Sequence, residues 1–248
     1  MLDAFLKAPL AHRTLHDVRA GRPENSLAGA RAAIAAGYGI EIDLQLSSDG
    51  VPMVFHDDHL QRLTRHFGAL REHTASELGA MRLTHGDEPI PTLEQFLELV
   101  AGQVPLLIEI KDQDGALGPD TGDIERLVCD ILQGYQGPVA LMSFNPHSVA
   151  KCAKFAPDIP RGLVTDPFDP ADWPEVPKER CAELAMIPDY ARVGASFVSH
   201  QVKDLHSAAL KGLIAQGATV FCWTVRSPAQ EKEARKVAQN ITFEGYLA

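Results

Sequence analysis

Acidic side chains stand at alternate positions in two apolar segments of the sequence. Glu41 and Asp43 alternate with isoleucine and leucine in the first segment, and Glu109 stands between isoleucines in the second. A strand points alternate side chains to opposite faces, so each segment places its carboxylates on one face of a sheet. Buried carboxylates need a cation or a basic partner, because an unpaired buried charge is strongly unfavourable. The pattern predicts three converging carboxylates that either bind a metal ion or form structural salt bridges.

A metal ion at this cluster would be a hard divalent cation. Glu41, Asp43 and Glu109 all offer oxygen, and no histidine or cysteine stands between them in either segment. Such ligands favour Mg²⁺ or Ca²⁺ over Zn²⁺, with water and substrate oxygens completing the coordination. Lys111 shares the strand face of Glu109. It is positioned to bind an anion beside the metal, and the alternative is that it only neutralises Glu109.

Two histidines end segments of strand-like composition. His12 follows Pro-Leu-Ala, and His56 follows Val-Phe. In a parallel barrel, the carboxyl ends of the strands carry the catalytic groups. Imidazole titrates near neutral pH, so one histidine could accept the proton of a nucleophile while the other protonates a leaving oxygen. Arg13 suits bidentate contact with a phosphate, and Glu24 would either orient it or approach the metal.

Short apolar segments alternate with amphipathic helical stretches along the whole chain. Such alternation indicates parallel strands with helices packed outside them. Eight strand–helix units in a chain of 248 residues favour a (β/α)8 TIM barrel over an open sheet, and we expect residues 1–248 to form a single domain. The eight candidate strands are Pro9–His12, Gly39–Leu46, Pro52–His56, Pro105–Ile110, Val139–Met142, Arg161–Val164, Ala195–Val198 and Thr219–Trp223.

One long connection does not fit a minimal barrel. Residues 59–90 separate the third candidate strand from the next helix and are charged, rich in histidine and weakly helical. Long connections on a barrel lie at the face where sites are built, so we expect an insertion over the barrel mouth that acts as a lid. Its apolar residues are spaced as in small helices that pack down onto the barrel: Leu60, Leu63, Phe67, Leu70, Leu78 and Met81.

The composition narrows the classes of partner and compartment. The chain has 33 acidic and 23 basic residues and a formal net charge of −10, which opposes nucleic acid or an anionic membrane as a partner. The N-terminal residues contain no long apolar run, so we expect no membrane insertion and a cytoplasmic location. The four cysteines form no CxxC motif and are expected to be reduced thiols in or near the core. The sequence does not indicate an oligomeric state.

Taken in order, these motifs make the sequence similar to the glycerophosphodiester phosphodiesterase family, in its bacterial cytosolic form, over nearly the whole chain. No single motif is decisive, but their order and spacing are highly specific. The matching segments are His12-Arg13, Pro23-Glu24-Asn25-Ser26, Gly37 to Leu44, Asp49-Gly50, Val54 to Asp57 with Leu60 and Arg62-Leu63-Thr64, Ile90-Pro91-Thr92-Leu93, Ile108 to Lys111 and Trp223-Thr224-Val225.

The resemblance implies a TIM barrel with a small insertion after its third strand and a metal-dependent activity that uses Mg²⁺ or Ca²⁺. The family releases sn-glycerol 3-phosphate and an alcohol from deacylated phospholipids, which makes a small glycerophosphodiester the expected substrate. By motif, the resemblance makes Glu41, Asp43 and Glu109 the metal ligands. It makes His12 and His56 the general acid and base.

The resemblance also assigns substrate contacts and shows where this chain departs from the family. Arg13 and Lys111 would bind the phosphate, and Trp223 would pack against the glycerol, the alternative being a core position. Thr14 stands where the family usually has glycine, and Arg226 stands where it commonly has asparagine. The usual Thr-Asp-x-Pro is also missing near the end of the chain. These departures concern head-group preference and local packing and do not touch the metal site.

Two other functions fit parts of the sequence. A phospholipase D-like phosphodiesterase acting on lysophospholipids would need an apolar groove or a membrane-facing patch at the mouth. A barrel that only binds glycerophosphodiesters would not need its catalytic groups, and the presence of both histidines and all three carboxylates speaks against it.

Overall fold

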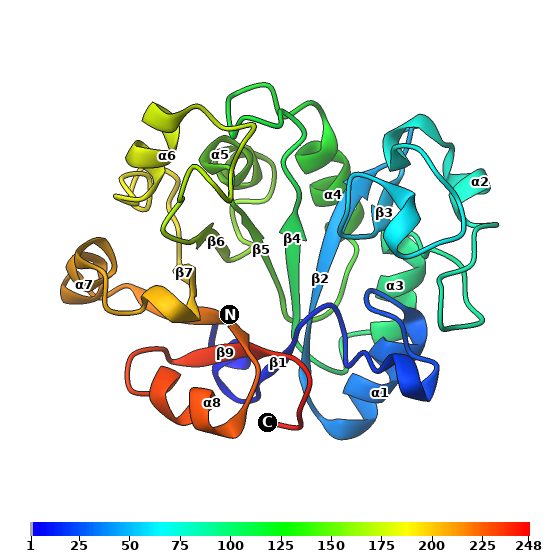
Figure 1. The fold of residues 1–248 in the computed structure, drawn as a ribbon, viewed down its shortest axis with the longest axis horizontal. Coiled ribbons are helices and arrows are strands. Elements are labelled where there is room, and N and C mark those ends of the chain that lie inside the picture. Colours follow the sequence, from blue (N-terminus) through cyan, green and yellow to red (C-terminus); the bar gives the residue numbers. More distant parts are fainter. Residues whose placement is uncertain (1) are drawn as a thin grey trace.

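The computed structural model describes residues 2–248, and its centre is a closed barrel of eight parallel strands (Figure 1). The strand order is β1-β9-β8-β7-β6-β5-β4-β2, and β1 also pairs with β2, which closes the ring. This confirms the predicted TIM barrel. The barrel strands are β1 (Leu10–Ala11), β2 (Gly39–Leu46), β4 (Leu106–Ile110), β5 (Val139–Ser143), β6 (Arg161–Thr165), β7 (Phe197–Gln201), β8 (Thr219–Val225) and β9 (Asn240–Phe243).

One predicted barrel strand was wrong. Within Pro52–His56, the strand β3 (Pro52–Val54) runs antiparallel to β2 and lies outside the barrel. Only five residues separate β2 from β3, which is enough for a hairpin, whereas a parallel pair needs a crossover of about a dozen residues or more. The eighth barrel strand is instead β9, which the sequence analysis missed.

Eight α-helices lie within residues 2–248, and α2 belongs to the insertion. No helix in this part of the chain is long and apolar enough to cross a membrane, and the cytoplasmic location stays a prediction. All four cysteines are free and buried. The helices are α1 (Leu27–Ala36), α2 (Ala75–Leu78), α3 (Leu93–Val100), α4 (Ile124–Leu132), α5 (Pro146–Phe155), α6 (Lys178–Leu184), α7 (Ala208–Ala215) and α8 (Pro228–Ala234).

The two faces of the strands have different surroundings. Ile40, Ile42 and Leu44 of β2 pack in the large apolar cluster that joins strands to helices. A second apolar cluster, on the other face of the strands, includes Leu107 of β4 and Phe5 of an N-terminal 3-10 helix. Because Leu107 precedes Glu109 by two positions, both point to the same side of β4, and the apolar side chains support the carboxylates.

The insertion, residues 59–90, lies beside the carboxyl end of β2 (cyan in Figure 1). It contains α2 and two 3-10 helices, Leu60–Arg62 and Leu70–Glu72. Five of the six apolar residues expected to pack down are buried, but Phe67 is 81% exposed, so that part of the expectation was wrong. The five buried residues form a separate small core together with four others, Met53, Phe55, Leu83 and Ile90.

Candidate active site

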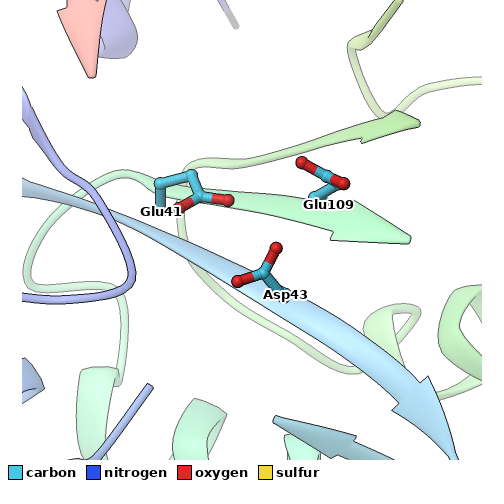
Figure 2. Close-up of side chains that lie close together, drawn as sticks. All are labelled: Glu41, Asp43 and Glu109. Carbon is cyan, nitrogen blue, oxygen red and sulfur yellow. The ribbon is translucent and has the colours of Figure 1, made fainter. Parts of the chain in front are cut away.

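Three carboxylates meet at the mouth of the barrel, as their spacing predicts. Glu41 and Asp43 come from β2 and Glu109 from β4, with Asp43 and Glu109 in register across the two strands. All three are buried, and a carboxylate oxygen of each lies within 4.8 Å of the others. Figure 2 shows the three side chains gathered on one side of the two strands. We call this group the carboxylate cluster.

Two cationic side chains contact the carboxylate cluster. Nζ of Lys111 lies 2.8 Å from Oδ1 of Asp43 and 2.5 Å from Oε1 of Glu109. Nε of Arg13 lies 3.4 Å from Oδ2 of Asp43, and its backbone N–H donates to Oε2 of Glu41 over 2.9 Å. Burial by itself would raise the pKa of Asp43, but the charges of Lys111, His56 and Arg13 outweigh it and hold that pKa far below its usual range. Lys111 therefore contacts two carboxylates of the cluster and balances one of their negative charges.

Of the three carboxylates, Glu41 is the one that no cationic side chain contacts directly. Burial, followed by the negative charges of Asp43 and Glu109, raises its pKa well above the usual value. With all three carboxylates ionised, as in a metal-bound state, the cluster would carry more negative charge than Lys111 and Arg13 balance, and all its donors are oxygens. This donor set fits a hard divalent cation such as Mg²⁺ or Ca²⁺. The identity of the metal stays a prediction.

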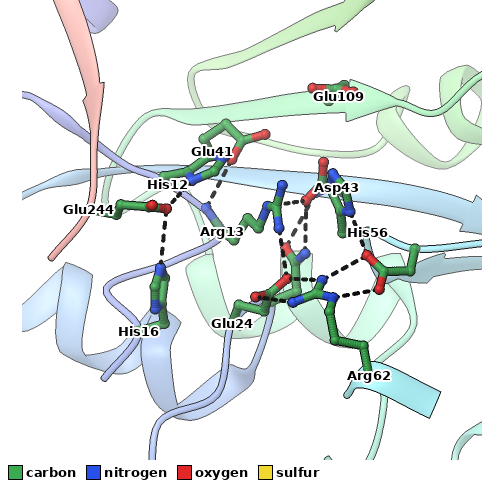
Figure 3. Close-up of polar contacts among 12 residues, drawn as sticks. His12, Arg13, His16, Glu24, Glu41, Asp43, His56, Arg62, Glu109 and Glu244 are labelled. Carbon is green, nitrogen blue, oxygen red and sulfur yellow. Dashed lines mark hydrogen bonds and ion pairs between the residues drawn. The ribbon is translucent and has the colours of Figure 1, made fainter. Parts of the chain in front are cut away.

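His12 lies directly after β1 and is paired with a carboxylate that the sequence analysis missed. Its Nδ1 lies 2.5 Å from Oε2 of Glu244, the residue that follows β9 (Figure 3). Glu244 also lies 3.7 Å from Nε2 of His16 and 2.7 Å from Nη2 of Arg226. The signal that could have found Glu244 is its place after Ile-Thr-Phe, because other rim residues also follow barrel strands.

Burial lowers the pKa of His12, and the hydrogen bond to Glu244 opposes this only in part. For Glu244, burial would raise the pKa, but the hydrogen bond to His12 and the nearby His16 and Arg226 outweigh it and hold the pKa far below the usual range. An ionised carboxylate only accepts hydrogen bonds, so Nδ1 of His12 carries the hydrogen. The neutral imidazole then keeps its Nε2 as a proton acceptor.

His56 reaches the mouth from the β2–β3 hairpin and not from a barrel strand as predicted. The N–H of Phe55 donates to the carbonyl of Asp43 over 3.0 Å, which carries the next residue to the mouth. Nδ1 of His56 lies 2.7 Å from Oδ1 of Asp57. Both predicted histidines therefore have a carboxylate at Nδ1. Their catalytic roles stay predictions.

Arg13 and Glu24 belong to an ion-pair network that extends to the insertion. Nη1 of Arg13 donates to Oε1 of Glu24 over 2.9 Å. Arg62 donates through Nη2 to the same oxygen over 2.7 Å and through Nε to Oδ2 of Asp57 over 2.5 Å. In Figure 3 the network links Arg13 to the carboxylate beside His56. Of the two roles considered for Glu24, the contacts show the one that orients Arg13.

A hollow of about 710 Å³ opens at the mouth and is lined by His56, Glu109, Lys111 and Trp223. Trp223 lies on β8 and is half-buried. Its Nε1 donates to the carbonyl of Ser199 over 3.0 Å. We call this space the mouth hollow. The contact of Trp223 with glycerol stays a prediction.

Two of the three departures from the family pattern, Thr14 and Arg226, lie next to this site. Thr14 has a φ of 75°, a left-handed conformation that glycine adopts freely and a β-branched residue rarely does. Its hydroxyl is buried and has no hydrogen-bond partner. Arg226 donates from Nε to Oε1 of Glu244 over 2.7 Å, so it supports the carboxylate that contacts His12.

The fold and the site define a class of protein: a closed parallel barrel whose mouth combines buried carboxylates, cationic side chains and two histidines. The chain belongs to the glycerophosphoryl diester phosphodiesterase family, whose pattern matches residues 12–240. The family predicted from the motifs is therefore confirmed.

Relatives of known sequence support this membership. A glycerophosphodiester phosphodiesterase of Caldanaerobacter subterraneus subsp. tengcongensis is 33% identical over 151 residues, which are 57% of this chain and 61% of that protein. The protein YhdW of Bacillus subtilis is 27% identical over 226 residues, or 87% of this chain and 84% of that protein. The chain thus matches about three fifths of the length of the first relative and most of the second.

Solved structures show the same fold. A phosphodiesterase of Oleispira antarctica in complex with the product sn-glycerol-3-phosphate superposes with a TM-score of 0.77 at 24% identity, covering 98% of this chain and 94% of that one. A glycerophosphodiester phosphodiesterase of Thermotoga maritima superposes with a TM-score of 0.71 at 21% identity, covering 95% and 94%.

Proposed function

We propose that this chain hydrolyses glycerophosphodiesters, the deacylated phospholipids, to sn-glycerol 3-phosphate and an alcohol. The observation that carries the proposal is the convergence of Glu109, Lys111 and His56 on the mouth hollow, with the rest of the carboxylate cluster next to Glu109 and in contact with Lys111 and Arg13. Membership of the family supports the same activity. The relative from Caldanaerobacter and the product complex from Oleispira are named for this chemistry.

The carboxylate cluster would hold one divalent cation, Mg²⁺ or Ca²⁺. When bound, the cation supplies positive charge to the phosphate and lowers the repulsion that an approaching nucleophile meets. It would also neutralise the cluster, which frees the Lys111 ammonium for a phosphate oxygen. The guanidinium of Arg13 would bind a second phosphate oxygen in a fixed orientation. Trp223 would pack against the glycerol.

His12 and His56 would divide the proton transfers between them. One accepts the proton of the attacking group, which is either a water molecule or the free hydroxyl of the glycerol. In the second case a cyclic glycerol phosphate forms, and a water molecule must then open the ring to give sn-glycerol 3-phosphate. The other donates a proton to the departing alcohol oxygen as the P–O bond breaks. The carboxylates at their Nδ1 atoms would fix the orientation of both rings.

The test is a turnover assay with glycerophosphocholine, glycerophosphoethanolamine and glycerophosphoglycerol, each with Mg²⁺, Ca²⁺ or excess EDTA. We expect turnover with a metal and none with EDTA. His12→Ala and His56→Ala should each lower kcat by about 10²–10⁴-fold, the usual contribution of an acid–base group. His206→Ala serves as the control, because His206 is an exposed histidine between β7 and α7. Full turnover in EDTA would exclude the proposed mechanism.

A phosphodiesterase acting on lysophospholipids is the second candidate, and exposed Phe67 on the insertion is the observation that favours it. We propose instead that the insertion acts as a lid and favours small water-soluble diesters. The wild-type protein should then cleave glycerophosphocholine much faster than lysophosphatidylcholine. Phe67→Ser should leave both rates unchanged, whereas a selective loss of lysolipid turnover in this variant would support the second candidate.

A further inference from the structure

The mouth hollow extends well beyond the groups that would hold a phosphate. Besides His56 and Lys111, it is lined by residues of the loop between β6 and α6, residues 166–177, which include Trp173 and Glu175. A wall built by this loop lies next to the site where the phosphate would bind. A diester has two substituents on phosphorus, so this neighbouring space is where an alcohol portion of the substrate can lie.

Aromatic rings make up much of this wall. Trp173 and Trp223 both pack edge-on against Phe144, with ring centroids 5.0 and 5.5 Å apart. Buried Phe168 supports Trp173 from behind at 5.4 Å. Nε1 of Trp173 donates to Oδ2 of Asp166 over 3.1 Å, and Nε1 of Trp223 is also bonded within the protein. Since both indole N–H groups are satisfied within the protein, what these two half-buried rings can offer a ligand in the hollow is apolar π surface.

The charges around these rings are almost all negative. Asp112, Asp166, Asp172 and Glu175 line the same part of the hollow, and Lys111 is the one lysine or arginine among the lining residues described. Lys111 is already held by the carboxylate cluster. A positively charged ligand would therefore be attracted here both by the faces of the indole rings and by the surrounding carboxylates.

We propose that the part of this wall around Trp173, Asp172 and Glu175 binds the departing alcohol, while Trp223 keeps its proposed place at the glycerol. This part of the wall selects a cationic alcohol, one that carries a quaternary or primary ammonium group such as choline or ethanolamine. The inference rests on the proposed function and adds the substrate class to it. A cation over an indole ring is attracted by the ring quadrupole, and the attraction is strongest with tryptophan. Diesters with neutral or anionic alcohols lack this attraction, and anionic ones are also repelled by the acidic residues.

The sharpest test changes only the charge of the alcohol. Glycerophosphocholine is compared with the glycerol phosphate diester of 3,3-dimethylbutanol, in which carbon replaces the ammonium nitrogen at nearly the same shape. The wild-type protein should prefer the choline diester by about tenfold in kcat/KM, a value between that of an exposed and that of a fully desolvated cation–π contact. Trp173→Leu should abolish this preference, and Trp173→Phe should keep part of it. Equal kcat/KM values for the two diesters in the wild-type protein would overturn the inference.

Charge variants separate electrostatics from packing. Asp172→Asn combined with Glu175→Gln should reduce the preference for choline. In the wild-type protein, added salt should also reduce this preference, because salt screens the carboxylates. Asp169→Asn is the matched control, because Asp169 lies on the same loop but does not line the mouth hollow. If Trp173→Leu lowers kcat/KM for both diesters by the same factor, the ring is only structural and the inference is wrong.

A binding measurement keeps this inference separate from the proposed activity. The sequence has only two tryptophans, Trp173 and Trp223, and both belong to this wall, so tryptophan fluorescence reports on it directly. Tetramethylammonium should change the fluorescence in a saturable way, whereas neopentyl alcohol and sodium chloride should not. If no diester is cleaved but tetramethylammonium saturates, the proposed activity fails and the cation site stands. If neopentyl alcohol matches tetramethylammonium, the cation site fails whatever the activity.

Discussion

The imidazole of His12 is held by a carboxylate from the opposite end of the chain, Glu244. Burial lowers the pKa of His12, and Glu244 is the main group that opposes this, while Arg13 lowers the pKa further. A bound divalent cation would add to the lowering. His12 is therefore neutral at neutral pH, and the carboxylate orients it and stabilises its protonated form.

Glu244→Gln should lower kcat by roughly 10–10²-fold, because the imidazolium formed in the reaction loses its stabilising charge. Loss of the carboxylate also lowers the pKa of His12, so whichever limb of the pH–rate profile belongs to His12 should move to lower pH. The groups that face His12 besides Glu244 are Arg13 and Asp43, with His16 next to Glu244, and they are unchanged in this variant. An unshifted profile with reduced thermal stability would mean that Glu244 is only structural.

Glu41→Gln should stabilise the metal-free protein at pH 7 while it abolishes the response to metal. The raised pKa of Glu41 means that the folded protein holds a proton that the unfolded chain releases. The free energy of unfolding is therefore highest below the normal pKa of a glutamate and falls as the pH rises above it. Glutamine does not ionise, so the variant does not lose this free energy at pH 7. Each kcal/mol gained raises Tm by roughly 2–4 °C in a chain of this size.

The control is Mg²⁺ or Ca²⁺ added to the wild-type protein, whose free energy of unfolding should rise by about 2.7 kcal/mol at a concentration 100 times the Kd. Scanning calorimetry with and without EDTA measures both effects. A Glu41→Gln variant that still gains stability from metal would remove Glu41 from the ligand set.

At the scale of elements, the first turn of α1 fits closely under the loop that follows β1. A Cβ atom on Gly29 would lie 2.1 Å from Oγ1 and 2.9 Å from Cβ of Thr14, so the threonine side chain would have to move. The same threonine has a left-handed backbone, which costs roughly 1–2 kcal/mol for a residue other than glycine.

Gly29→Ala should therefore lower the free energy of unfolding by about 1–3 kcal/mol, as overpacking usually does. Thr14→Gly should leave stability unchanged or raise it. The double variant should be more stable than Gly29→Ala alone, because the clash is gone and alanine has the higher helix propensity. Urea unfolding of the four proteins gives the coupling energy. Additive effects would mean that the two residues do not press on each other.

Much of this arrangement could be predicted at the level of elements. The alternation in β2 and β4 fixed the faces of Glu41 and Glu109, because a strand has a period of two. The strand β9 was missed because it has only four residues and two of them are polar. Glu244 was missed with it. His56 was predicted at the mouth because it ends a segment expected to be a barrel strand, but that segment forms a hairpin with β2, since the turn before β3 is too short for a parallel crossover.

What could not be predicted depends on contacts between distant segments. The pairs Arg62 with Glu24 and Trp173 with Phe144 join residues 38 and 29 positions apart. No periodicity within one segment indicates such a contact. The exposure of Phe67 is similar, since helical spacing predicts burial and the residue lies outside both 3-10 helices of the insertion.

At the scale of the whole molecule, the insertion has its own small core but is anchored to the barrel. Its apolar cluster includes Met53 and Phe55, which belong to or follow β3 and are tied to β2 by hydrogen bonds. We predict that residues 1–248 unfold as one cooperative unit. A single heat-absorption peak in calorimetry, with equal calorimetric and van't Hoff enthalpies, would agree with this.

Leu78→Ala tests the coupling, because Leu78 is fully buried in the insertion. It should cost about 2–5 kcal/mol and lower the midpoint of the single peak by the corresponding amount. Val149→Ala, in another apolar cluster of the barrel, is the matched comparison and should shift the same peak. Two separate peaks in the Leu78→Ala protein would show that the insertion is a domain of its own.

The ammonium group of Lys111 gives the molecule an internal counter-ion. It already sits between Asp43 and Glu109 at hydrogen-bond distance, where an external cation would otherwise be needed to hold two like charges together. The chain can therefore reach its folded state before any ion arrives, and loading becomes an exchange of one positive charge for another. If the activity depends on a metal as proposed, the protein would stay folded but inactive in a cell short of the ion and would become active when the ion returns.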